Sequence, residues 1–134
     1  MSILPHQKVT VYYMQLRTIT PMLWVDNVRT TIDYYVSVLG FDEANYSSDP
    51  EWGVVDKHFV SIMFSRPNEH VPYNGPQFTG SLYLKTDDAE AWWSFLKDRA
   101  TIVYPIEDFS YGMREFAIKD CNGYILQFGE DVEK

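Results

Sequence analysis

The sequence predicts an α+β fold in which two tandem βαβββ units form an open half-barrel cleft. Three observations support this prediction. A strand–cap–helix pattern occurs twice, with an offset of 61 residues that carries Thr20 onto Ser81. A stretch containing Pro, Asn and Gly, residues 67–79, separates the two occurrences. The Asn122-Gly123 pair predicts a hairpin near the C-terminus. Because one βαβββ unit is too small to bury its own sheet, the two units must share a core.

The first unit is expected over residues 19–66, after an N-terminal extension, residues 1–18, that shows no clear period. It begins with a strand over 19–25. Asp26 is a suitable N-cap for the following helix, whose apolar residues recur at three- to four-residue spacing. Gly40 is expected to end that helix in a left-handed conformation. Three strands and a tight turn complete the unit: 41–46, 53–55, the turn at Asp56-Lys57, and 59–64.

The second unit is expected over residues 80–134. It begins with a strand over 81–85 and a helix cap at Asp87 or Asp88, followed by a helix over 89–99. Three residues of this helix are predicted to face the core: Trp92, Phe95 and Leu96. The remaining strands are expected over three ranges: 102–104, 113–119 and 124–128. The chain should therefore form one compact domain with an internal repeat.

Composition limits the function classes. The chain has 134 residues, 46% of them hydrophobic and 16% aromatic, which argues against disorder. Its formal net charge of −8 argues against nucleic-acid binding, which needs a basic surface. The single cysteine, Cys121, excludes an intrachain disulfide and suits a reducing compartment. No apolar run reaches the length of a membrane span, about 18 residues. We therefore expect a cytoplasmic protein that contacts neither nucleic acid nor membrane.

Several segments resemble the vicinal oxygen chelate superfamily, which includes glyoxalase I, extradiol dioxygenases, and fosfomycin- and bleomycin-resistance proteins. They are PMLWVDNV (21–28), VLGF (38–41), WGVV (52–55), IMFS (62–65), YGMREFAIKD (111–120) and NGY (122–124). The resemblance spans about residues 19–130, and the last segments look most like the bleomycin-resistance branch. It implies a glyoxalase/bleomycin-resistance-like fold. Together with the need to cover sheet edges, it leads us to expect a homodimer.

In the metalloenzyme branches of that superfamily, the first and last strands of each half supply His and Glu metal ligands. The resemblance places these positions at Thr20, Met63, Ser81 and Gln127. Two hydroxyls, a thioether and an amide include no anionic donor for a divalent ion. We therefore predict no metal at this place and no cofactor. No nucleophile–base pair is recognisable, so no catalytic residue is assigned.

The alternation of side chains along strands predicts which residues share a face with these four positions. Met22 and Trp24 should lie beside Thr20, and Tyr83 beside Ser81, while Trp52 and Tyr111 come from loop or strand-edge positions. The predicted ligand-binding set is Thr20, Met22, Trp24, Trp52, Met63, Ser81, Tyr83, Tyr111 and Gln127. The alternative is that the large members simply fill the core. Aromatic faces of this kind suit a planar or cationic organic ligand.

Three functions are compatible with the sequence. The leading hypothesis is a small-molecule-binding protein that lacks the usual metal site and sequesters a planar or cationic ligand, of which bleomycin is one candidate. The alternative is a metal-dependent lyase, isomerase or dioxygenase with a displaced metal site that uses His6, His58 or His70. In the third, the cleft serves only dimer or partner contacts. Arg114 and Glu115 are interpreted as part of the family motif or as a solvated pair, and Glu115 also as a carboxylate base.

Overall fold

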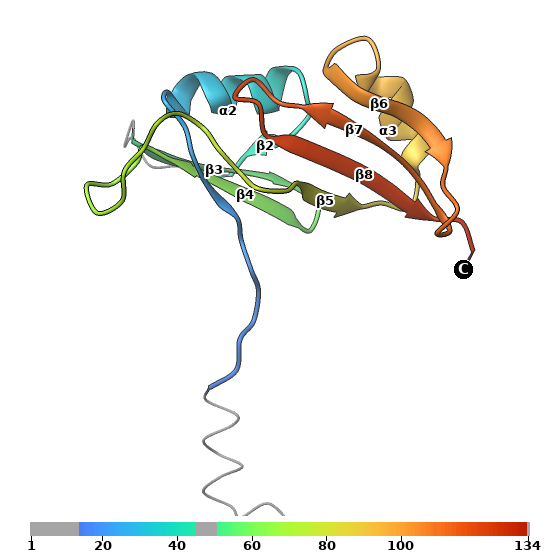
Figure 1. Ribbon diagram of the computed structural model, residues 1–134, viewed down its shortest axis with the longest axis horizontal. Coiled ribbons are helices and arrows are strands. Elements are labelled where there is room, and N and C mark those ends of the chain that lie inside the picture. The colour runs from blue at the N-terminus through green and yellow to red at the C-terminus, as the bar shows by residue number, and fades with distance from the viewer. Residues whose placement is uncertain (1–13, 45–50, 134) are drawn as a thin grey trace, which may run out of the picture.

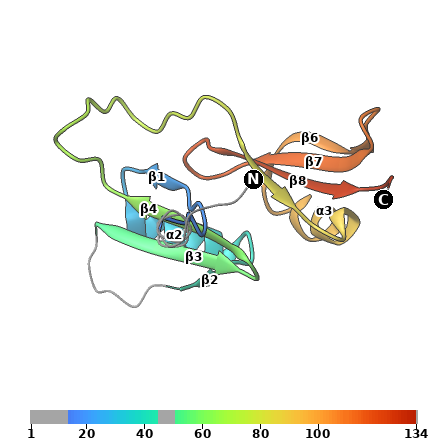
Figure 2. The same cartoon turned by 90° about the horizontal axis from the view of Figure 1, so that it is seen from below.

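The computed structural model describes residues 14–44 and 51–133. It contains two four-stranded sheets, which lie beside one another in Figures 1 and 2. The first sheet has the order β1-β4-β3-β2 and the second β5-β8-β7-β6. The first unit consists of β1 (Met22–Trp24), α2 (Val28–Ser37), β2 (Asp42–Glu43), β3 (Trp52–Lys57) and β4 (Val60–Ser65). The second consists of β5 (Leu82–Lys85), α3 (Ala89–Leu96), β6 (Thr101–Asp108), β7 (Met113–Lys119) and β8 (Ile125–Asp131).

The predicted repeat is visible in the two helix starts and in the strand pairing. Asn27 Oδ1 accepts a hydrogen bond from the Thr30 backbone N–H at 2.9 Å, and Asp88 Oδ1 accepts one from Ala91 at 3.0 Å. The two caps are 61 residues apart, the offset found in the sequence. In both units the strand before the helix pairs in parallel with the last strand, β1 with β4 and β5 with β8. The linker between β4 and β5 runs outside both sheets (Figure 2).

One face of each sheet packs against its helix. In the first unit, the fully buried Tyr35 of α2 lies 4.8 Å from Phe64 of β4, measured between ring centroids. In the second unit, the rings of Trp92 and Phe128 are 5.4 Å apart, and those of Trp93 and Phe116 are 5.3 Å apart. Both tryptophans of α3 therefore pack on the sheet. Within the described ranges, neither helix is long and apolar enough to cross a membrane.

The two units are joined through the β7–β8 turn and the end of α3. The Tyr35 hydroxyl donates a hydrogen bond to Asp120 Oδ2 at 2.6 Å, and the Tyr124 hydroxyl donates one to the Trp24 carbonyl oxygen. Arg99 donates to the carbonyl oxygens of Ser37 and Val38 at the end of α2, at 2.8 and 3.0 Å. These contacts hold the first helix against the second unit.

Two sequence predictions, one about a helix cap and one about a turn, are wrong. The cap of α2 is Asn27, not Asp26, whose carboxylate instead accepts a hydrogen bond from Tyr73 in the linker at 2.9 Å. The turn between β3 and β4 is not at Asp56-Lys57 but at the next two residues, 58–59, because Asp56 and Lys57 are still paired with β4. Asp56 is held there by Ser61, whose hydroxyl donates to its carboxylate at 2.7 Å.

Element lengths and one core assignment also differ from the expectation. Strand β1 is shorter than predicted, and β6 is longer, with register shifts along its pairing with β7. Helix α3 ends at Leu96, three residues earlier than expected. Phe95 is 39% exposed instead of facing the core, and the Arg99 guanidinium lies over its ring. Residues 45–46 of the predicted strand over 41–46, and residues 1–13 of the extension, lie outside the described residues.

Candidate functional site

Among the described residues, no helix covers the second face of either sheet. In β4, Ile62 and Phe64 are buried against α2, whereas Met63 and Ser65 point to the opposite side and are half-buried. Register pairing places Trp24 and Trp52 beside Ser65, so both tryptophans share that open face. Five predicted site residues belong to it or to the segment leading into it: Thr20, Met22, Trp24, Trp52 and Met63.

The open face of the second sheet holds a hydrogen-bonded cluster around Glu115 of β7. The Tyr83 hydroxyl donates to Glu115 Oε1 at 2.8 Å, and the Tyr104 hydroxyl donates to Oε2. Gln127 Nε2 donates to Tyr104 at 2.8 Å and to Glu115 Oε2 at 3.2 Å. The Ser81 hydroxyl donates to Gln127 Oε1, which completes the set. We refer to Ser81, Tyr83, Tyr104, Glu115 and Gln127 as the Glu115 cluster.

The Glu115 carboxylate is buried, but the aromatic rings around it are not. Glu115 is 1% exposed, whereas Tyr83 is 42% exposed and the neighbouring Tyr111 is 61% exposed. Tyr83 reaches Glu115 by crossing β8 at Gly129, where an added Cβ would lie 2.6 Å from Tyr83 Cζ. The result is a buried negative charge beneath tyrosine rings that face solvent.

The tyrosines of this face are held in their neutral form. Burial, followed by the hydrogen bond to Glu115, raises the pKa of Tyr104 to about 12. The same two causes, in the same order, raise the pKa of Tyr83 further. The phenols therefore remain hydrogen-bond donors to the carboxylate across the physiological pH range.

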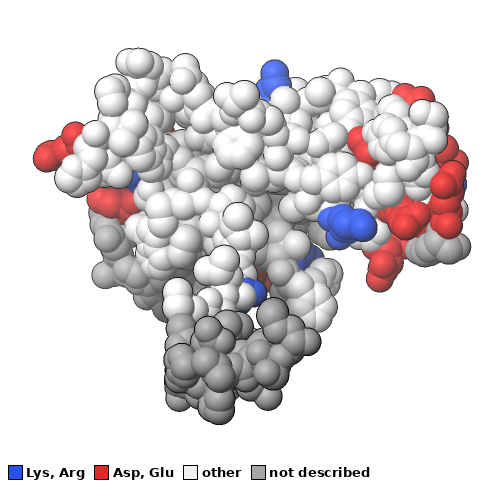
Figure 3. Space-filling view, turned by 60° about the horizontal axis from the view of Figure 1, so that its bottom comes forward, with Lys and Arg blue, Asp and Glu red and all other residues white. Residues whose placement is uncertain are grey.

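Further acidic side chains gather at the adjoining end of this sheet, where Figure 3 shows Asp and Glu side chains near the C-terminus. Strand pairing brings the end of β6, the start of β7 and the end of β8 together there. Four carboxylates in this region are exposed: Glu107, Asp108, Asp131 and Glu133. Arg114 pairs with Asp108 at 2.7 Å. The potential beside the Glu115 cluster is therefore negative.

The structure separates the predicted site residues into two groups. Ser81, Tyr83 and Gln127 belong to the Glu115 cluster, with Tyr111 beside it, and the other five belong to the first sheet. Among the described residues, no hydrogen bond or ring contact joins the two groups. The interpretation of Arg114 and Glu115 as a solvated pair is wrong, because Glu115 is buried and Arg114 binds Asp108.

Residues that could coordinate a metal are dispersed over the described part of the chain. In that part, no group of three or more His, Cys, Asp or Glu side chains is placed to hold a metal ion. His58 lies in the β3–β4 turn and His70 in the linker. His6 lies outside the described ranges.

Comparisons with known proteins agree with this architecture. The family model described as Glyoxalase/Bleomycin resistance protein/Dioxygenase superfamily matches residues 16–128. A search of curated protein sequences finds no significant match. A member of the same superfamily from Sphaerobacter thermophilus is 21% identical, with a TM-score of 0.74, over 87% of this chain and 98% of that one.

Two further solved structures are similar to this chain. The bleomycin-binding protein from Streptomyces verticillus, complexed with copper(II)-bleomycin, is 19% identical, with a TM-score of 0.65, over 86% of this chain and 96% of that one. A lactoylglutathione lyase from Agrobacterium tumefaciens is 16% identical, with a TM-score of 0.63, over 87% and 95%. At these identities the structural likeness concerns the fold. The family match extends over most of the sequence, and the chain therefore belongs to the glyoxalase/bleomycin resistance protein/dioxygenase superfamily.

Proposed function

We propose that this protein binds and sequesters a planar organic cation on the open face of its second sheet, at the Glu115 cluster. The observation that supports this most strongly is the buried Glu115 carboxylate beneath the exposed rings of Tyr83 and Tyr111. The residues proposed for the first sheet, Thr20, Met22, Trp24, Trp52 and Met63, form a second aromatic surface that would contact a larger ligand. The unpaired, exposed Cys121 suits a reducing compartment, and we place this function in the cytoplasm.

Two electrostatic terms favour a cation at this face. A cation over a tyrosine ring gains about 0.5–1 kcal/mol at an exposed site. A unit charge about 7 Å from the carboxylate gains about 2 kcal/mol more at an effective dielectric constant of 20. The ligand need not touch Glu115, because the field of a buried charge is less screened than that of a solvated one. The exposed carboxylates nearby add attraction in the same direction.

The residues at the usual metal-ligand positions do not fit a divalent ion. Ser81 and Gln127 are hydrogen-bonded to each other, and the Gln127 amide is also engaged with Tyr104 and Glu115. On the first sheet, Met63 supplies only a thioether, and Thr20 a neutral hydroxyl. Such donors are poor ligands for hard cations. This supports a binding function without metal at these positions.

A homodimer is the assembly we propose for this function. Strands β1, β2, β5 and β6 are the edge strands of the two sheets in the described part of the chain. A second copy would cover edges of this kind and enclose the ligand face. Sedimentation equilibrium should therefore give twice the mass of one chain.

A thermal-unfolding screen of EDTA-treated protein tests the proposal. The probes are proflavine, a planar cation, and fluorescein, a planar anion, together with Ni²⁺, Zn²⁺, Mn²⁺ and Fe²⁺. A ligand present at about 100 times its dissociation constant should stabilise the folded protein by about 2.7 kcal/mol. We expect proflavine to raise the melting temperature and fluorescein not to. A saturable shift with one metal and none with proflavine would instead favour a metal-dependent enzyme.

A further inference from the structure

A cavity of about 520 Å³ lies between the two units, and no residue of the Glu115 cluster lines it. The first unit contributes Phe41 and the β3–β4 turn, and the second contributes β5, the start of α3 and Phe128. A neighbouring cavity of about 370 Å³ shares Lys57 and Trp92 with it. Volumes of about 300–1,000 Å³ are typical of small-molecule sites. None of the nine residues predicted from the sequence lines either cavity.

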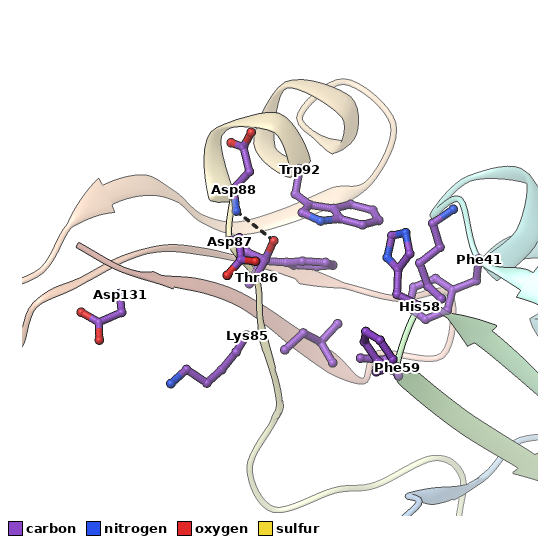
Figure 4. A pocket seen from close by; sticks show the side chains of 13 residues that line it. Phe41, His58, Phe59, Lys85, Thr86, Asp87, Asp88, Trp92 and Asp131 are labelled. Carbon is purple, nitrogen blue, oxygen red and sulfur yellow. Dashed lines mark hydrogen bonds between the residues drawn. The ribbon is translucent and has the colours of Figure 1, made fainter. Parts of the chain in front are cut away.

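The wall of the larger cavity is aromatic at one end. Trp92 is braced by Phe128, whose ring is tilted by 31° to the indole. Figure 4 shows the Trp92 indole, the His58 imidazole and the Phe41 ring around the same space. A planar ring placed there would contact Trp92, which is held in position by packing and would lose little conformational freedom.

The charges that line the cavity favour a neutral occupant. Lys57 and Lys85 are opposed by Asp87, Asp88 and Asp131, so the lining charges nearly cancel. Asp88 is already engaged in capping α3, and Figure 4 shows Lys85 and Asp131 away from the aromatic end. The ammonium of Lys57 and the imidazole of His58 are left there as donors to a neutral oxygen. An anion would also be repelled by the formal net charge of −8.

Phe59 occupies the mouth of this cavity and is fully exposed, at 105%. It is the second residue of the two-residue β3–β4 turn, after His58, which has a positive φ of 54°. When an exposed aromatic side chain at the mouth of an apolar cavity covers an apolar ligand, apolar surface is removed from water, which is favourable in free energy. We propose that the cavity binds an uncharged planar aromatic molecule of about two fused rings, stacked on Trp92 and covered by Phe59.

Titration calorimetry with 2-naphthol tests this site on the full-length protein. We expect saturable binding of one molecule per chain. Phe59→Ala should weaken binding about threefold to tenfold, the effect of losing one aromatic contact. The exposed position of Phe59 makes a folding defect in this variant small. The matched control is Phe78→Ala, which removes a half-exposed phenylalanine that does not line this cavity and should leave the affinity unchanged.

Other measurements separate this site from the Glu115 cluster. Glu115→Gln should leave 2-naphthol binding unchanged, and 2-naphthoate, the corresponding anion, should bind more weakly than 2-naphthol. Failure of the wild-type protein to bind 2-naphthol would overturn the proposal, as would an affinity unaffected by Phe59→Ala. Loss of binding in Glu115→Gln would place the aromatic molecule on the open face instead.

Discussion

Gly129 provides the space through which Tyr83 reaches the buried carboxylate of Glu115. Any side chain at position 129 would meet the Tyr83 ring, since even a Cβ would lie 2.6 Å from Tyr83 Cζ. The contact involves the far end of a flexible side chain, so Tyr83 can swing away without disturbing the backbone. The hydrogen bond between Tyr83 and Glu115 would then be lost, and the carboxylate would become accessible to water.

We therefore predict that Gly129→Ala lowers the free energy of unfolding by about 1 kcal/mol, the contribution of one hydrogen bond. Urea denaturation measures this. In a Tyr83→Ala background the ring is already absent, and the same substitution should cost almost nothing. An equal cost in both backgrounds would show that Tyr83 does not occupy the space above Gly129.

The tyrosines around Glu115 also predict how stability changes at alkaline pH. An unfolded tyrosine releases its proton near pH 10, whereas Tyr104 in the folded protein has a pKa of about 12. A raised folded-state pKa contributes stability that is fully present below pH 10 and is lost as the pH rises toward 12. Urea titrations over this range should show stability falling with pH, and Tyr104→Phe should reduce the slope. An unchanged slope would contradict the assignment.

Sequence reasoning identified most of this cluster but not its centre. The resemblance to the superfamily led to Ser81 and Gln127, with the 61-residue repeat relating Ser81 to Thr20, and the alternation along β5 added Tyr83. The burial of Glu115 was not predictable, because an Arg-Glu pair in a strand equally well describes two solvated side chains. Tyr104 was missed because register shifts along β6 are needed to direct its hydroxyl to Glu115, and irregular pairing has no clear sequence signal.

Helix α2 begins after two adjacent polar residues, either of which is a suitable N-cap type. Both Asp26 and Asn27 are good N-cap types, so propensity does not separate them. In the structure, Asn27 is the cap. The Asp26 carboxylate accepts a hydrogen bond from the Tyr73 hydroxyl in the linker, and the Asp26 carbonyl oxygen accepts one from Arg66 at 2.6 Å. A contact with a residue 47 positions away is not visible in a local pattern.

We predict that Asn27→Ala lowers the free energy of unfolding by about 1 kcal/mol, the usual cost of losing an N-cap side chain. Asp26→Ala should cost less, since its bond to Tyr73 is exposed to solvent. Asn27→Asp is the control that keeps the acceptor. Urea denaturation of the three variants tests the ranking, and a larger cost at position 26 would contradict it.

The hydrogen bond between Tyr35 and Asp120 joins the two units of the molecule. Tyr35 is fully buried, and Asp120 is 5% exposed. Burial raises the pKa of Asp120, while hydrogen bonds from Tyr35 and from the backbone of the turn favour its charged form. Removing the phenol would leave a buried carboxylate oxygen without its partner.

Tyr35→Phe should lower the free energy of unfolding by about 1–3 kcal/mol for this reason. Because the units share one core, we expect a single cooperative transition at a lower melting temperature in scanning calorimetry. Tyr34→Phe is the matched control, since the Tyr34 hydroxyl has no hydrogen-bond partner within the described ranges. Two separate transitions in Tyr35→Phe would show that each unit folds alone.

The tandem arrangement of two units was the most predictable feature of the structure. Two βαβββ units in tandem follow from the repeated cap and helix stripe, which are local patterns. The placement of one unit against the other was not predictable, because it depends on contacts such as Tyr35 with Asp120, 85 positions apart. For the same reason, the aromatic cavity between the units was not predicted from the sequence.

The proposed binding function depends most on attraction between the buried charge of Glu115 and a planar cation. The most direct test is titration calorimetry of proflavine with the wild-type protein, Glu115→Gln and Glu107→Gln. Glu107 is the matched control, because it lies opposite Glu115 on β6 but is exposed. We predict that Glu115→Gln weakens binding about tenfold or more, a loss of about 1.4 kcal/mol or more, and that Glu107→Gln changes it by less than about threefold. Equal affinities in the wild-type protein and Glu115→Gln would contradict the account.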